Sequence, residues 1–328
     1  MTADQSNATE EVETVHGNNP LVTVVITTYN RPSYLKDAVR SVRAQTYAPV
    51  ELVVVDDHSD TPAQEVLNDV SLESFHSVNC IRHEENRGAN AARNTGIRAA
   101  SGEYIAFLDD DDRWVETKVE RQVEAFQKDD DIGVTYTGLR TVNIEDAGEV
   151  IPPEIEMNLT KELLCRNVIG TLSAVMVRTD VARQVPFDEE FPSWADLEWY
   201  VNLSLMTMFR RIPEPLVIYD YASHNRLSED FGKKQAAYER FVTEFDDLAA
   251  QYGHTFRRKM RGWAAYRLGS TALNLHRYDQ ARRLLATAVR WYPLEPLFLK
   301  YFIATAGGRY THGLARSVKR VASVAHSS

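Results

Sequence analysis

The chain has few cysteines and lacks any long hydrophobic run. Its two cysteines, Cys80 and Cys165, lie in apolar surroundings and form no C-x-x-C pair, which predicts reduced, buried thiols and argues against a disulfide framework. No apolar stretch approaches the roughly 20 residues that a membrane-spanning helix needs. Residues 1–20 are polar and acidic, unlike a signal peptide. These absences favour a cytoplasmic protein without a spanning segment.

The charge balance also excludes a class of partner. The 328 residues contain 37 Lys and Arg against 47 Asp and Glu, a formal net charge of -10, which disfavours binding to nucleic acid. The C-terminus is a local exception, because basic residues lie there among small and apolar ones: Arg309, Arg316, Lys319 and Arg320. Such a tail can contact an anionic membrane surface peripherally, on the cytoplasmic face of the cell membrane. A solvated final helix is the alternative.

Apolar β-branched runs alternate with helical patterns along the first part of the chain. Strands are expected at 21–27, 50–55, 78–81 and 104–108, with helices between them. A helix is expected at 114–126, after the fourth of these strands. From about residue 132 the pattern is less regular, with expected strands at 134–137, 173–178 and 217–221 and helices at 159–166 and 195–208. Alternating strands and helices predict a mostly parallel sheet with right-handed crossovers.

The same pattern divides the chain. Residues 1–20 are expected to be a disordered leader, and residues 21–225 a catalytic domain whose two halves are about 21–112 and 113–225. From residue 226 to 328 strand signals cease, which predicts a helical C-terminal region. The stretch 264–293 resembles a single tetratricopeptide-like helical hairpin, too little for a repeat array.

Polar residues follow each of the first four expected strands. They are 28–31, 56–59, 86–88 and 109–112. In an open sheet of this kind, ligands bind beyond the carboxyl ends of the strands. The sequence therefore predicts one binding rim that carries carboxylates, an arginine, hydroxyls and an aromatic ring.

The four consecutive aspartates from Asp109 to Asp112 are the densest charge on this rim. Like charges so close together repel each other unless a cation or a helix N-terminus relieves them, and carboxylate oxygens suit Mg²⁺ or Mn²⁺. A solvated acidic loop, or the acidic first turn of the helix expected at 114–126, is the other interpretation. The position directly after a strand in a β-α pattern favours a metal site.

Four motifs, in this order, resemble those of the family 2 glycosyltransferases. They are VVITTYNR at 24–31, VVVDDHS at 53–59, NRG to ARNTGI across 86–97, and GEYIAFLDDDD at 102–112. The resemblance covers about residues 21–221. It implies the GT-A fold, an α/β architecture with a Rossmann-like, mostly parallel sheet flanked by helices, here extended by a helical C-terminal appendage.

The resemblance also implies roles for residues of the rim. A nucleotide-diphosphate sugar, most commonly UDP-linked, and a divalent cation, Mn²⁺ or Mg²⁺, are expected. Asp111 matches the metal position of the family's D-x-D element. The expected nucleotide-binding positions are Thr27, Tyr29, Arg31, Asp57, Arg87, Asp109 and Asp110, of which the last two would contact the ribose or the metal shell.

A member of this kind inverts the anomeric carbon and needs a general base. Asp196 stands at the start of the helix expected at 195–208, where the family places that carboxylate, and Glu198 is its rival. Two departures from the family pattern are Ala195, where an acidic or amide residue is common, and Asn202, where an arginine often holds the diphosphate. Diphosphate binding would then depend on Arg87, a lysine or Arg226.

Two other functions remain open at this point. A sugar nucleotidyltransferase would share the sheet and the carboxylates, but it would want a glycine-rich basic loop after the first strand, and residues 28–31 are TYNR. A catalytically inactive scaffold or carbohydrate-binding protein would lack metal-dependent donor hydrolysis.

The acceptor is indicated only by resemblance. The chain resembles archaeal transferases that extend dolichyl- or polyprenyl-phosphate-linked glycans for protein N-glycosylation and S-layer biogenesis. A membrane-associated cytoplasmic enzyme with a lipid-linked glycan acceptor is therefore expected. Hexose, hexosamine and hexuronic acid donors all remain possible.

Overall fold

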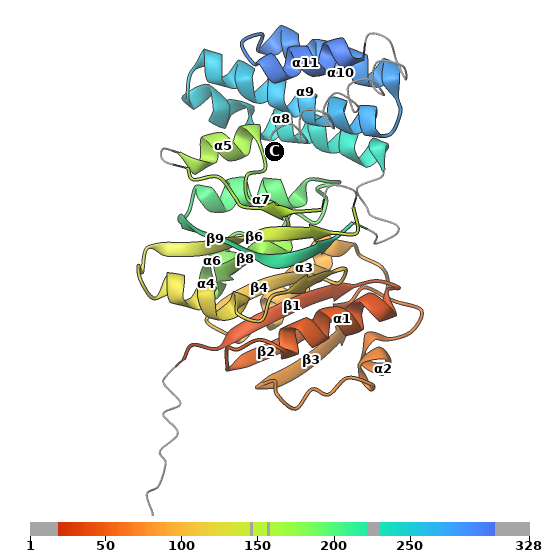
Figure 1. The fold of residues 1–328 in the computed structure, drawn as a ribbon, viewed down its shortest axis with the longest axis vertical. Helices are drawn as coiled ribbons and strands as arrows, with labels where there is room; N and C mark the ends of the chain where they lie inside the picture. Colours follow the sequence, from red (N-terminus) through yellow and green to blue (C-terminus); the bar gives the residue numbers. More distant parts are fainter. Residues whose placement is uncertain (1–18, 145–146, 156–157, 222–229, 306–328) are drawn as a thin grey trace, which may run out of the picture.

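The protein is described here by a computed structural model that covers residues 19–144, 147–155, 158–221 and 230–305 (Figure 1). Most of the expected leader, the segment that holds Arg226 and the basic tail with Arg309, Arg316, Lys319 and Arg320 lie outside the described residues. One large sheet forms the body of the molecule, and the C-terminal helices are stacked at one end of it (Figure 1).

The first four strands form the parallel part of the sheet. They are β1 (Val22–Thr28), β2 (Val50–Asp56), β3 (Ser77–Arg82) and β4 (Tyr104–Asp109), connected by α1 (Pro32–Arg43), α2 (Ala63–Leu67) and α3 (Ala89–Ala99). β1 lies between β2 and β4 and pairs with both in parallel. Residues from β1 alternate between two apolar cores, with Val25 in one and Val24 and Ile26 in the other. Burial on both faces explains the continuous apolar runs.

The second half adds strands of mixed direction. They are β5 (Asp112–Trp114), β6 (Ile132–Val142), β7 (Glu149–Val150), β8 (Val175–Arg178) and β9 (Met208–Asp220). The order across the sheet is β3-β2-β1-β4-β8-β6-β9-β5, and β7 pairs with β6. The helices of this half are α4 (Lys118–Phe126), α5 (Leu159–Cys165), α6 (Thr179–Gln184) and α7 (Ala195–Ser204). A 3₁₀ turn, η1, spans Leu172–Ala174.

The sequence misplaced several boundaries in this half, since β6 and β9 are longer than the strands expected at 134–137 and 217–221 and two helices differ as well. The helix expected at 114–126 begins only at Lys118, because Asp112–Trp114 forms β5 and pairs antiparallel with β9. The helix expected at 195–208 ends at Ser204, and Met208 already begins β9. In both places a distant strand supplies the hydrogen bonds, and such tertiary pairing overrides the local helical pattern.

The C-terminal region is helical over its described residues, 230–305, as expected. It consists of α8 (Phe231–Gln251), α9 (His254–Asn274), α10 (Tyr278–Trp291) and α11 (Pro296–Ala304). Phe241 and Phe245 of α8 and Met260 of α9 belong to the same buried core as Phe107 of β4 and Trp199 of α7. The helices thus share a continuous core with the sheet domain. None of the helices in the described ranges is long and apolar enough to cross a bilayer.

Both cysteines are free thiols, as predicted. Cys165 is buried at the end of α5, and burial raises its pKa to about 12. Cys80 is only partly buried, so the expectation of a fully buried thiol is wrong there. The reason is that β3 is the edge strand of the sheet.

Candidate active site

The carboxyl ends of β1, β2 and β4 bring the polar motifs together. In the strand register, Thr28 lies opposite Asp56, and Thr27 lies opposite Asp109. Thr27 is partly buried, whereas the Tyr29 side chain just beyond the strand is 48% exposed. The Tyr29 ring is therefore accessible to stack on a planar ligand. A cavity of about 260 Å³ opens beside it, lined by residues that include Asn30, Arg31 and Ser59.

The acidic run is held by groups from the loop after β1. The Thr28 hydroxyl donates to Asp110 Oδ2 at 2.7 Å, and Arg31 Nη1 contacts Asp110 Oδ1 at 3.1 Å and Asp111 Oδ2 at 3.2 Å. Burial raises the pKa of Asp110 to about 6, although Thr28 and Arg31 both favour its ionised form. Arg31 therefore neutralises part of the charge that a ligand cation would otherwise meet.

The four aspartates of the run have different environments. The side chains of Asp109 and Asp111 are 32% and 14% exposed, whereas Asp112 is buried and accepts a hydrogen bond from Ser173 Oγ at 2.6 Å. In the described part of the chain, no group of three or more His, Cys, Asp or Glu could hold a metal ion by itself. Mg²⁺ usually binds proteins through one or two carboxylates and completes its shell with water and substrate phosphates. The accessible carboxylates of Asp109 and Asp111 fit that requirement.

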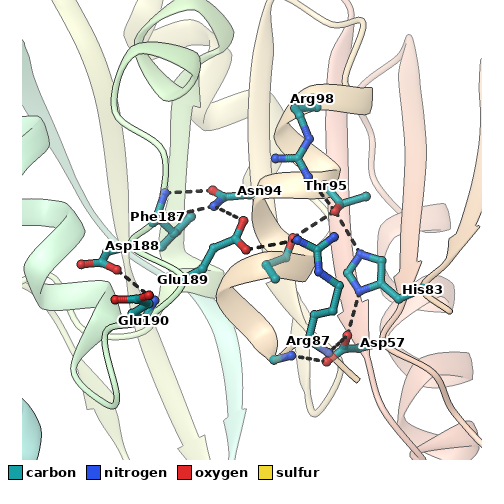
Figure 2. A network of polar contacts seen from close by, with 12 residues as sticks. Asp57, His83, Arg87, Asn94, Thr95, Arg98, Phe187, Asp188, Glu189 and Glu190 are labelled. Atoms are coloured by element: carbon teal, nitrogen blue, oxygen red, sulfur yellow. Dashed lines mark hydrogen bonds and ion pairs between the residues drawn. The ribbon is translucent and has the colours of Figure 1, made fainter. Parts of the chain in front are cut away.

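Asp57 organises the loop that follows β3, as Figure 2 shows. Its carboxylate accepts hydrogen bonds from the backbone N–H groups of Arg87 and Gly88, and from His83 Nδ1, each at 2.8 Å. His83 Nε2 in turn contacts Thr95 Oγ1 at 3.0 Å. A carboxylate offers about four acceptor positions, so Asp57 retains room for one further donor, such as a nucleobase N–H.

The same network connects the two halves of the domain (Figure 2). Arg87 forms a half-exposed ion pair with Glu189 at 3.2 Å. Asn94 of α3 donates to the carbonyl of Phe187 and accepts from its N–H, both at 2.9 Å. The loop after α6 is therefore attached to α3, the helix that begins beside the rim. A phosphate group that binds Arg87 would compete with Glu189 for the guanidinium.

Asp196 lies in the first turn of α7, two residues after Trp194, whose backbone is left-handed (φ 60°). Asn167 Nδ2 donates to Asp196 Oδ2 at 3.2 Å. Burial raises the pKa of Asp196, and the nearby negative charge of Asp109 raises it further, whereas Arg93 and Arg267 lower it. The influence of Asp109 connects Asp196 electrostatically to the acidic rim.

Glu198 has a different environment, although it lies only two residues further along α7. It is 3% exposed, accepts a hydrogen bond from Asn202, and is surrounded by the charges of Asp188, Arg240 and Glu244. Asn202 is therefore engaged with Glu198. Arg240 and Glu244 belong to α8, so part of the charge around Glu198 comes from that helix.

Sequence reasoning missed two arginines at this site. Arg93 of α3 contacts Asp109 Oδ1 at 3.1 Å and Asn90 Oδ1 at 3.2 Å. Arg93 lies inside the motif that spans residues 86–97, and its place in that motif could have indicated a role at the site. Arg267 of α9 lies more than 70 residues after Asp196 in a helical region without motifs, so no local pattern could have indicated it.

The buried Glu198 gives a prediction for stability. Burial raises its pKa to about 8, while an unfolded glutamate titrates near ~4.3. Between these values the folded state holds a proton that the unfolded state lacks, so folding stability falls as pH rises from about 4.3 to about 8. Glu198→Gln should remove this loss, at about 1.4 kcal/mol per pKa unit.

Thermal unfolding of the two proteins at several pH values between about 5 and 8 measures the effect. Relative to wild type, the Glu198→Gln melting temperature should gain several degrees across this range. Glu65→Gln, at an exposed position of α2, is the control, and its melting temperature should change with pH as that of wild type does. Parallel curves for Glu198→Gln as well would show that Glu198 is ionised in the folded protein.

Comparison with known proteins agrees with this geometry. Residues 23–178 match the profile of glycosyl transferase family 2. Over 189 residues the chain is 33% identical to UDP-Glc:alpha-D-GlcNAc-diphosphoundecaprenol beta-1,3-glucosyltransferase WfgD of Escherichia coli, which covers 57% of this chain and 70% of that protein. The chain belongs to the family 2 glycosyltransferases and is a transferase.

Solved structures support the fold. TarS of S. aureus in complex with UDP-GlcNAc superposes with a TM-score of 0.64 at 18% identity, over 83% of this chain and 81% of that one. A mannosyltransferase from Pyrobaculum calidifontis in complex with GDP-Man and Mn²⁺ gives a TM-score of 0.55 at 18% identity, over 88% and 86% of the two chains. The expected GT-A fold with its C-terminal helices is confirmed.

Proposed function

We propose that the protein is an inverting, metal-assisted glycosyltransferase that moves a sugar from a UDP-linked donor to a hydroxyl of a growing, lipid-linked glycan. The observation that supports the proposal is the difference in charge around the two carboxylates: Asp196 is affected by Arg93 and Asp109 of the rim, whereas Glu198 is affected by Asp188, Arg240 and Glu244. Asp196 as the general base and the rim as the diphosphate-binding site could then take part in the same transfer reaction.

The donor would bind along the rim. Tyr29 would stack on the base, Asp57 would accept a base N–H through its remaining acceptor position, and Thr27 would line the same edge. Asp111, with Asp109 and Asp110 beside it, would hold Mg²⁺ or Mn²⁺. When bound, that cation supplies electrostatic stabilisation to the leaving diphosphate.

The arginines of the rim would add positive charge near the diphosphate. Arg31 already contacts Asp110 and Asp111, and Arg93 contacts Asp109. These two residues are better placed for this role than Arg87, which pairs with Glu189. They would compensate for Asn202, at the position where an arginine was expected.

The transfer would be a single displacement. Asp196 would accept the proton of the acceptor hydroxyl as its oxygen forms a bond to the anomeric carbon. The sugar–phosphate bond would break on the opposite face, and its electron pair would leave with the nucleoside diphosphate. The products are the extended glycan with inverted configuration, the nucleoside diphosphate and a proton on Asp196.

The relatives support the choice of substrates. The name of the E. coli protein specifies UDP-glucose and a diphosphoundecaprenol-linked acceptor. One structural neighbour holds UDP-GlcNAc, and another holds GDP-Man with Mn²⁺. A dolichyl- or polyprenyl-linked glycan of N-glycosylation or of the cell surface is the proposed acceptor.

Purified protein tests the function with a panel of UDP-, GDP- and dTDP-sugars, with Mn²⁺, Mg²⁺ or EDTA, and with membrane lipid extract as acceptor source. Metal-dependent release of nucleoside diphosphate would establish the reaction and identify the donor. If every donor remains intact under all of these conditions, the protein is an inactive scaffold.

Peripheral membrane contact belongs to the same proposal, and the C-terminal helices suggest where it would occur. Residues 254–328 contain fourteen Lys and Arg against two Asp and Glu, although the whole chain carries -10. Large apolar side chains are exposed at α11 and just before it: Leu294 is 73%, Leu299 48% and Ile303 59% exposed. Basic charge beside exposed apolar side chains suits an anionic bilayer.

Vesicle sedimentation tests this contact. Wild type should bind phosphatidylglycerol vesicles and not phosphatidylcholine vesicles, and added salt should release it. A Leu299→Asp/Ile303→Asp variant should bind severalfold more weakly. The matched control is Leu205→Asp/Met206→Asp, at exposed apolar positions between α7 and β9. Equal binding by the α11 variant, or a change only in its oligomeric state, would contradict the proposal.

A further inference from the structure

We infer that Arg267 of α9 is a positioning residue for the proposed base, Asp196, so the C-terminal helices complete the active site. The inference rests on the proposed function, because it assigns Arg267 a role that depends on the base. It gives the helical region a part in the reaction in addition to any contact with a membrane.

Arg267 contacts both chain segments that surround Asp196. Its Nη2 donates to the carbonyl of Cys165 at 3.1 Å, and Cys165 lies two residues before Asn167, which donates to Asp196. The guanidinium carbon lies 4.8 Å from the centre of the Trp194 ring, and Trp194 directly precedes α7. One side chain therefore fixes the end of α5 and the start of α7 relative to each other.

The left-handed backbone of Trp194 makes this contact important. Its φ of 60° is unusual for a large side chain, and the Trp194 carbonyl accepts the N–H of Glu198 in the first turn of α7. The ring also meets Phe241 of α8 edge-on, with centroids 6.3 Å apart. Packing by α8 and α9 thus supports the backbone turn from which Asp196 projects.

The buried charge of Arg267 connects it electrostatically to Asp196. Nη1 of Arg267 is buried and has no hydrogen-bond partner among the described residues. Burial lowers the pKa of Arg267 to about 10, and the carboxylate of Asp196 opposes that shift. Arg267 therefore stays protonated at neutral pH, and a buried cation of this kind requires a nearby anion. Asp196 supplies it.

The charged and titratable groups around Asp196 come from three other elements and from α7 itself. Arg93 of α3 and Arg267 of α9 favour its ionised form, and Asp109 of β4 disfavours it. On α7 the buried Tyr200 hydroxyl is affected by the charges of Asp196, Asp109 and Arg93. Burial raises the pKa of Asp196, so Arg267 acts against the change that would leave the base protonated.

The expected consequence is a shift of the pH–rate profile. Without the Arg267 charge the pKa of Asp196 rises, so the acid limb of kcat/KM should move to higher pH by about one unit or more. Arg267→Gln keeps a donor for Cys165 but loses the charge, whereas Arg267→Lys keeps the charge. The Gln variant should lose about tenfold in kcat/KM on the acid limb and recover at alkaline pH. The Lys variant should retain a limb close to wild type.

The matched control is Arg261→Gln on the same helix, because Arg261 pairs with Asp246 at 2.7 Å, away from Asp196. It should leave the limb in place. If Arg267→Gln does not fold, Arg267→Met, which is apolar and of similar length, provides the same comparison. A loss of rate that is equal at every pH would show a purely structural role and overturn the inference.

A separate result would overturn the proposed function on which the inference rests. If Asp196→Asn keeps wild-type turnover, the base is misassigned whatever Arg267 does. If Asp196→Asn is inactive while the acid limb of kcat/KM for Arg267→Gln stays unshifted, the assignment of Asp196 as the base is supported. Only the role of Arg267 is then contradicted. The two failures are therefore distinguishable.

Discussion

Replacing Asp196 with Asn should lower kcat by roughly 10²–10⁴-fold, the range that a general base contributes, with little change in donor affinity. The amide cannot accept the proton of the acceptor hydroxyl, but it has nearly the shape of the carboxylate and can still receive the hydrogen bond from Asn167. Steady-state transfer to the acceptor, together with calorimetric binding of the donor, separates the two effects.

Glu198→Gln is the matched control for that experiment. It alters a buried carboxylate on the same helix, two residues away, that is bonded to Asn202 and affected by charges of α8, so kcat should remain near wild type. Donor hydrolysis by water should decline less than transfer in the Asp196→Asn variant, because water can lose its proton to the solvent. A large loss in Glu198→Gln with activity retained in Asp196→Asn would reverse the assignment of the base.

Replacing Asp111 with Ala should reduce turnover by on the order of 10³-fold, since an electrostatic contribution of several kcal/mol to the leaving group would be lost. The variant should also need much more Mn²⁺ to approach saturation, and donor binding should weaken with it. Titrating the rate with Mn²⁺ at fixed donor concentration measures both changes. Asp110 should continue to hold Arg31, so the loop after β1 should stay in place.

Asp130→Ala provides the comparison for Asp111→Ala. Asp130 is an exposed aspartate in the turn between α4 and β6, and its loss should leave both the rate and the metal requirement unchanged. An unaltered Mn²⁺ titration in the Asp111 variant would exclude Asp111 as a ligand. In that event Asp109, the other accessible carboxylate of the run, becomes the position to test.

Most of the parallel half of the fold could be predicted from the sequence. β1, β2 and β4 are buried on both faces, and such strands produce unbroken apolar runs that differ sharply from the amphipathic helices between them. The second half was predicted less well. β5 has only three residues, and it exists because β9 pairs with it from about 100 residues further along the chain.

The candidate site divides in the same way. The positions of Thr27, Tyr29, Asp57 and Asp109 to Asp111 follow from motifs at strand ends, and the strand register brings them to one rim. Their ligands and roles stay predictions. The choice between Asp196 and Glu198 could not be made from spacing, because both lie in the first turn of α7 and only the packing of α8 distinguishes their surroundings.

The sequence by itself determined the family, the order of strands and helices in the parallel half and the acidic run, because these depend on local patterns and short-range spacing. Only the tertiary structure decided which charges meet. Arg31 contacts the run, Arg93 contacts Asp109, and Arg267 lies close enough to affect Asp196. Electrostatic interactions depend on distance and burial in space, and neither can be read from positions along the chain.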